Sequence, residues 1–217
     1  MTIKAFRDWK FEDVERTFGL RRLYEHPLLT QWQAHEEPID EETGRYLERL
    51  RQELIRTVDM FNEAELKVYF IGPLLTLVPF RTEQRRPFLD RPMSFLYGEG
   101  QQAAGRVDWM LAEGRQEPRQ PFFFLHEYKK EPEAQGDPLG QLLIAMVGAQ
   151  QQNERAFPVL GSYVVRRSWF FVLLDRSEYA VSLGLDATRP DLKGIYHMLH
   201  FARRHVASTV ARYAPST

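Results

Sequence analysis

The spacing of apolar positions along the chain predicts an order of helices and strands. Apolar residues recur every three or four positions in stretches typical of amphipathic helices, and they alternate or run together in stretches typical of strands. The expected helices cover residues 11–20, 43–61, 62–75, 138–153 and 191–213. The expected strands cover residues 87–97, 103–112, 122–128, 159–165, 169–174 and 179–183.

Two helix starts have recognisable capping residues. Asn62 followed by Glu65 resembles a capping box, in which the side chain of each residue accepts a hydrogen bond from the other's backbone amide. Asp137 followed by Pro138 fits an N-cap and the first helical position. The strand at 122–128 is apolar on both faces, so we expect it in the middle of a sheet.

This order predicts an α/β (α+β) fold with a central mixed β-sheet flanked by helices. The first 40 or so residues show only one short helical pattern and are interrupted by Pro27 and Pro38. We therefore expect an N-terminal helical extension over 1–42, packed on a core domain over 43–217.

Composition narrows the kinds of site and partner. The chain has 217 residues, 43% of them hydrophobic, no cysteine and a net charge of −1. Any metal must therefore be held by oxygen or histidine ligands. No stretch matches a membrane helix or a signal peptide, so we expect no membrane partner and a cytoplasmic location. The near-zero charge counts against a strong general affinity for nucleic acid.

Two neighbouring strands carry the residues that suggest chemistry. Asp108 lies on the first, and the second ends with Glu127 and Lys129, which share one face because side chains alternate along a strand. A hairpin would bring the Asp108 carboxylate beside Glu127. With the carbonyl of Tyr128, these oxygens could hold Mg²⁺, for which Mn²⁺ can substitute. The expected site is that of a magnesium-dependent phosphodiesterase, with His126 and the Tyr128 ring in the core.

These residues resemble the PD-(D/E)XK nuclease superfamily, which has the restriction-endonuclease-like fold. The resemblance covers residues 62–165 and depends on Gly-x-x-Asp at 105–108, Glu-x-Lys at 127–129 and the helix that follows. The position before the aspartate, often proline in that family, is Val107. The resemblance implies a metal-dependent nuclease acting on DNA, with Asp108 and Glu127 as metal ligands and Lys129 assisting.

The resemblance also implies two further site residues. A glutamate on the first core helix often completes the pocket, and here Glu63 or Glu65 is the candidate, with Glu63 favoured. Gln141 corresponds to a glutamine seen in exonuclease branches of the superfamily. A purely structural role remains open for both positions. Acids in the first turn of a helix interact favourably with the helix dipole, and Gln141 also fits a polar position on the flank of a helix.

Several alternatives to this function remain. The chain could be a non-catalytic nucleic-acid-binding or assembly protein that retains the nuclease fold, or an interaction domain that uses Trp9, Trp32 or Trp169, which also fit a core. A basic stripe on the last helix could follow phosphates or face solvent, and it contains Lys193, His197, His200 and Arg204. The sequence does not show whether the substrate is DNA or RNA. If the protein cuts both strands of a duplex, a homodimer is favoured.

Overall fold

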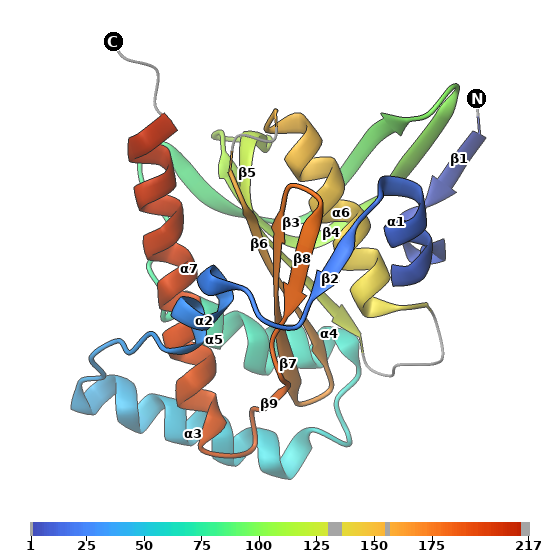
Figure 1. Ribbon diagram of the computed structural model, residues 1–217. Coiled ribbons are helices and arrows are strands. Elements are labelled where there is room, and N and C mark those ends of the chain that lie inside the picture. Colours follow the sequence, from blue (N-terminus) through green and yellow to red (C-terminus); the bar gives the residue numbers. More distant parts are fainter. Residues whose placement is uncertain (1, 130–135, 155–156, 214–217) are drawn as a thin grey trace.

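A mixed sheet forms the centre of the protein (Figure 1). The computed structural model describes residues 2–129, 136–154 and 157–213. Its strands are β1 (Thr2–Ala5), β2 (Arg21–Leu23), β3 (Arg85–Tyr97), β4 (Gln101–Glu113), β5 (Arg119–Lys129), β6 (Val159–Val165), β7 (Ser168–Asp175), β8 (Glu178–Val181) and β9 (Leu185–Asp186). They pair in the order β1-β4-β5-β6-β7-β8-β2, with β3 also on β4 and β9 on β7.

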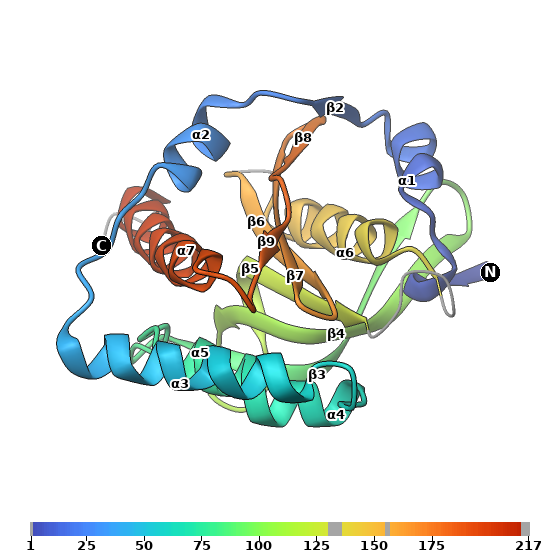
Figure 2. The same ribbon diagram turned by 90° about the horizontal axis from the view of Figure 1, so that it is seen from below.

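Helices cover both faces of this sheet. The α-helices are α1 (Phe11–Phe18), α2 (Pro27–Gln33), α3 (Glu41–Thr57), α4 (Glu63–Leu66), α5 (Gly72–Thr76), α6 (Pro138–Gln152) and α7 (Asp191–Tyr213), with a 3₁₀ turn η1 (Phe6–Asp8) and a π-helical segment η2 (Lys67–Ile71). Figure 2 shows α6 and α7 on opposite sides of β6 and β7. None of the helices in the described ranges is both long and apolar enough to cross a lipid bilayer.

The two faces of the sheet bury separate apolar clusters. One cluster joins α3, α4, η2, α5 and α7 to the sheet, and it includes Trp109 and Tyr128. The other joins α1 and α6 to the sheet, and it includes Val107 and Met110. The expected core tryptophans Trp9, Trp32 and Trp169 are all buried, as the core alternative predicted.

The fold class predicted from the sequence is confirmed, because a mixed sheet is flanked by helices. Strand β5 lies between β4 and β6, as its two-sided apolar pattern indicated. Strands β3, β4 and β5 are antiparallel neighbours, and β6 then runs parallel to β5 after the crossover through α6. The predicted helix over 62–75 forms, but the segment η2 within it has π-helical hydrogen bonding.

The N-terminal segment joins the sheet as well as packing on it. Strand β1 pairs with β4 and β2 pairs with β8, although strands this short give no visible alternation in the sequence. Asp137 caps α6 through Leu139 N (3.0 Å) and also accepts a hydrogen bond from Phe11 N (2.7 Å). A side chain at Gly140 would meet the backbone of residues 9–11, so glycine allows this close approach.

Candidate functional site

Asp108 lies in β4, where its carboxylate is held by the backbone of β5. Trp109 pairs with His126 across the two strands, and Tyr128 N donates a hydrogen bond to Asp108 Oδ2 (3.0 Å). Val107 and Trp109 pack into clusters on opposite faces, so the usual two-residue alternation is interrupted at Asp108. On the neighbouring strand, Asp90 has a positive φ of 49°. The hairpin thus brings Asp108 to the end of β5, as the sequence predicted.

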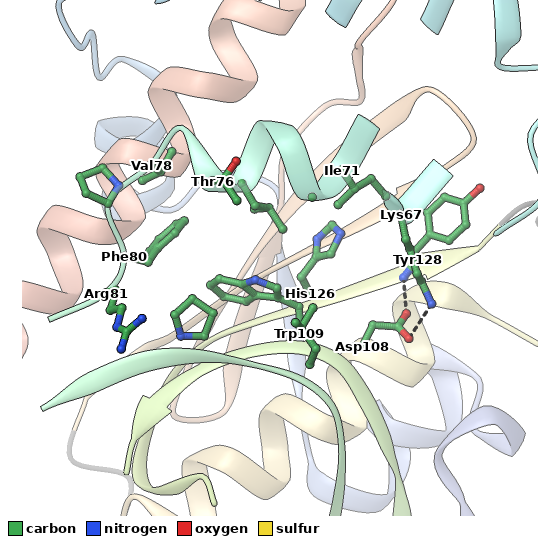
Figure 3. Close-up of a pocket in the computed structure, with 15 residues that line it drawn as sticks. Lys67, Ile71, Thr76, Val78, Phe80, Arg81, Asp108, Trp109, His126 and Tyr128 are labelled. Atoms are coloured by element: carbon green, nitrogen blue, oxygen red, sulfur yellow. Dashed lines mark hydrogen bonds and ion pairs between the residues drawn. The ribbon is translucent and has the colours of Figure 1, made fainter. Parts of the chain in front are cut away.

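Lys67, the first residue of η2, joins this carboxylate to a second one. Its Nζ lies 2.9 Å from Asp108 Oδ1 (Figure 3). The same Nζ lies 2.7 Å from Glu63 Oε1. The side chains of Asp108, Lys67 and Glu63 are 23%, 34% and 44% exposed, so solvent reaches all three. We call these three residues the Asp108 site.

Two carboxylates share one ammonium group in the Asp108 site. Burial lowers the pKa of Lys67, but Asp108 and Glu63 outweigh burial and the net pKa is raised. Lys67 therefore remains protonated at neutral pH. With both acids ionised, the three side chains carry one net negative charge.

The structure separates the two candidate glutamates of the first core helix. Glu65 and Asn62 form the predicted capping box, with Glu65 N to Asn62 Oδ1 at 2.9 Å and Asn62 N to Glu65 Oε2 at 2.8 Å. Glu65 thus has a capping role. Glu63 is the one connected to Asp108, through Lys67.

Glu127 and Lys129 can be located only along the backbone. They pair with Tyr163 and Val165 of β6, and their side chains lie outside the described part of the structure. Among the side chains that are described, no group of three or more His, Asp or Glu has the arrangement of a metal site. The predicted ligand set includes Glu127, so it is not tested by this result.

Gln141 is buried in the first turns of α6, where its N–H donates to Asp137 O. Helix α6 contributes to the apolar cluster of Val107, whereas Tyr128 belongs to the cluster on the other face. The cavity at Asp108 is not lined by Gln141. Because the side chains of Glu127 and Lys129 are not described, the predicted place of Gln141 in the site stays a prediction.

A cavity of about 400 Å³ adjoins the Asp108 site, between α5 and the sheet (Figure 3). His126 and Tyr128 lie in its wall, and both are buried, as expected from the sequence. His126 Nδ1 is 2.7 Å from Ser162 Oγ, and its ring stacks on Trp169 with centroids 5.0 Å apart. Burial lowers the pKa of His126 to about 4, so the imidazole is neutral at physiological pH.

The basic stripe expected on α7 is divided, because Lys193 and Arg204 are exposed whereas His197 is half-buried and His200 is buried. His200 and Arg204 contact the carboxylate of Glu37, and His197 Nδ1 accepts a hydrogen bond from Glu37 N (3.0 Å). His35 Nε2 lies 3.3 Å from the same carboxylate, which is only 14% exposed. Desolvation raises the pKa of Glu37, but Arg204, His200 and His35 together hold it below its usual value. We call these five residues the Glu37 cluster.

Sequence reasoning missed Lys67. Its one signal in the sequence is its position four residues after Glu63, a spacing that places the two side chains on one helix face. The contact with Asp108 depends on how this helix docks against β4, which local spacing does not determine.

Comparisons with known proteins add no family. No protein-family model matches the chain, and a search among curated proteins gives no match.

Proposed function

We propose that this protein is a metal-dependent phosphodiesterase of the PD-(D/E)XK nuclease type, acting on nucleic acid and most readily on DNA. The observation that carries this proposal is the hydrogen bond from Tyr128 N to Asp108 Oδ2. Because Tyr128 lies between Glu127 and Lys129 in the chain, this bond brings the Asp108 carboxylate to the backbone that carries the predicted acid and lysine. The meander β3–β4–β5, followed by α6 and the parallel strand β6, also supports the resemblance.

The oxygen donors at the Asp108 site suit a hard divalent cation such as Mg²⁺. Among the described side chains and backbone, each oxygen of Asp108 has one hydrogen-bond or ion-pair partner, which leaves acceptor capacity for a metal. The net negative charge of the Asp108 site also favours a bound cation. Asp108, Glu127 and the Tyr128 carbonyl would hold the ion, and Glu63 would supply a further carboxylate next to it.

Bound Mg²⁺ would polarise the phosphodiester and lower the pKa of a coordinated water. Lys129 would orient the attacking water or neutralise charge that develops on the phosphoryl oxygens. Lys67 would hold Asp108 and Glu63 at a fixed separation. Lys67 is the first residue of the π-helical segment η2, and its ammonium group contacts both acids.

The test is cleavage of single-stranded, double-stranded and branched DNA and RNA with Mg²⁺ or Mn²⁺. We expect cutting by the native protein, and its loss in Asp108→Asn and in Lys129→Ala. Glu42→Gln, which changes an exposed glutamate in the first turn of α3, is the matched control and should cut normally. Circular dichroism of each variant separates loss of chemistry from loss of folding.

One observation favours a second candidate, a non-catalytic nucleic-acid-binding or assembly protein. The ammonium group of Lys67 already neutralises part of the charge on Asp108, so the carboxylate has a cation without any metal. This reading predicts a folded native protein with no cleavage of any substrate in the panel and no Mn²⁺ binding by calorimetry. That pair of results would exclude the nuclease.

A further inference from the structure

The cavity beside the Asp108 site has an apolar interior. Aliphatic and aromatic side chains from η2, α5, the segment after α5 and strands β4 and β5 form its wall: Ile71, Leu75, Val78, Phe80, Trp109 and Tyr128. At about 400 Å³ it lies in the size range of small-molecule sites, which are mostly apolar with a few polar groups. Figure 3 shows Lys67 and Asp108 at one end of the cavity and Arg81 at the other.

Lys67 and Arg81, at the two ends of the cavity, differ in whether their positive charge is free to bind an anion. Lys67 is already paired with Asp108 and Glu63, so its charge is compensated. Arg81 is exposed, and within the described ranges no carboxylate lies within ion-pair distance of it. Thr76 and Leu89 are exposed and line the cavity as well, so they form part of its rim.

We propose that this cavity binds an amphipathic organic anion, with the apolar body inside and a carboxylate or similar anionic head at Arg81. The apolar wall favours a body without hydrogen-bonding groups, since a buried polar group without a partner is costly. A nucleobase, with several polar groups on its edge, matches this wall less well. The guanidinium of Arg81 offers a fork of donors to a carboxylate.

This site is separate from the proposed nuclease chemistry. It needs neither a metal nor Glu127 and Lys129, and the Asp108 site lies at the end of the cavity away from Arg81. Binding can therefore be measured with EDTA present, and failure of either proposal leaves the other standing.

Calorimetry with hexanoate, octanoate, 1-octanol and octylammonium tests the proposal. Octanoate should bind more tightly than hexanoate, by about fourfold for each added methylene that the cavity buries. It should also bind up to about fivefold more tightly than 1-octanol, the gain expected from a solvent-exposed ion pair. Octylammonium should bind more weakly than 1-octanol.

Three variants locate the ligand. Arg81→Gln should remove the preference for octanoate over 1-octanol, whereas Arg56→Gln, at an exposed arginine on α3, should leave it intact. Thr76→Trp places a large ring at the rim without disturbing the core and should weaken every ligand. Equal affinity for octanoate and 1-octanol, an unchanged preference in Arg81→Gln, or no binding by the native protein would overturn the proposal. So would binding of a nucleoside monophosphate in place of octanoate.

Discussion

The Asp108 site and the Glu37 cluster are both groups of charged side chains beside a helix, but their charges are balanced in opposite ways. In the Asp108 site, two carboxylates share the single ammonium group of Lys67. In the Glu37 cluster, one carboxylate contacts Arg204, His35 and His200, and His197 accepts a hydrogen bond from the Glu37 backbone. The first arrangement has an excess of acid and can accept another cation.

In the Glu37 cluster, the charge of the carboxylate is already balanced. Arg204 neutralises Glu37, and burial lowers the pKa of His197 and of His200, so both histidines favour the neutral form. Protonation would add positive charge that the single carboxylate could not balance. We infer that the Glu37 cluster fastens the segment before α3 to α7, whereas the Asp108 site is the one proposed to bind a cation and a phosphate.

The largest expected effect is on cleavage activity, which should depend on the Asp108 site and not on the Glu37 cluster. Asp108→Asn keeps the shape of the side chain but removes its charge, and it should lower metal-dependent cleavage by at least about 100-fold, the upper range for residues that only support a metal ligand. Glu37→Gln should cleave at the native rate. Initial rates on the best substrate of the panel provide the measurement, and equal losses in the two variants would contradict the division of roles.

Acid should lower the free energy of unfolding through His126, which lies beside the Asp108 site. His126 has a pKa of about 4 when folded, below the ordinary value of 6.5, so the unfolded chain binds the extra proton first as the pH falls. The contribution of neutral His126 to the free energy of unfolding is fully present above pH 6.5. It is lost progressively toward pH 4, by about 3 kcal/mol in total. Urea unfolding at several pH values measures this loss.

The matched comparison uses the double variant His126→Phe with Ser162→Ala, which removes the hydrogen-bonded pair together. Its stability should depend less on pH over the same interval. Since the lowered pKa values of His197 and His200 give a loss with the same sign, some dependence should persist in the variant. An undiminished slope would mean that the Glu37 cluster, and not His126, governs the response to acid.

Glu37→Gln should affect stability where Asp108→Asn affects activity. The change removes the carboxylate that His200 and Arg204 contact, and loss of one partner from a mostly buried polar group costs about 2 kcal/mol. Thermal or urea unfolding measures the cost. Glu36→Gln, at the exposed neighbouring position, is the control, and equal stability of the two variants would show that the Glu37 cluster does not fasten the segment.

The sequence predicted those features that local spacing determines. The range of α7, the capping box of Asn62 and Glu65, and the start of α6 at Pro138 were all anticipated, because each depends on residues within a few positions of one another. The place of Asp108 beside β5 followed from simple hairpin geometry. Whether Glu127 and Lys129 act there stays a prediction.

Features that depend on packing between distant segments were not predictable in the same way. The contact of Lys67 with Asp108 requires a helix to dock on a strand 41 residues away. Glu37 lies in a stretch without any periodic pattern, and its partners on α7 are more than 150 residues later. The apolar cavity likewise exists only between elements, so no single stretch of sequence indicates it.

The smallest expected effect is on metal affinity, and it tests whether more negative charge at the Asp108 site makes a cation bind more tightly. Lys67→Met removes the ammonium group that competes with a metal for Asp108 and Glu63, and it should raise Mn²⁺ affinity on the order of tenfold. Arg204→Met leaves a single carboxylate at Glu37 and should create no such binding. Calorimetric titration with Mn²⁺ measures both, with Lys193→Met as a control at an exposed lysine. Unchanged affinity in Lys67→Met would mean that Asp108 and Glu63 are not where the cation binds, because a metal ligated by them must respond to the loss of a charge less than 3 Å away.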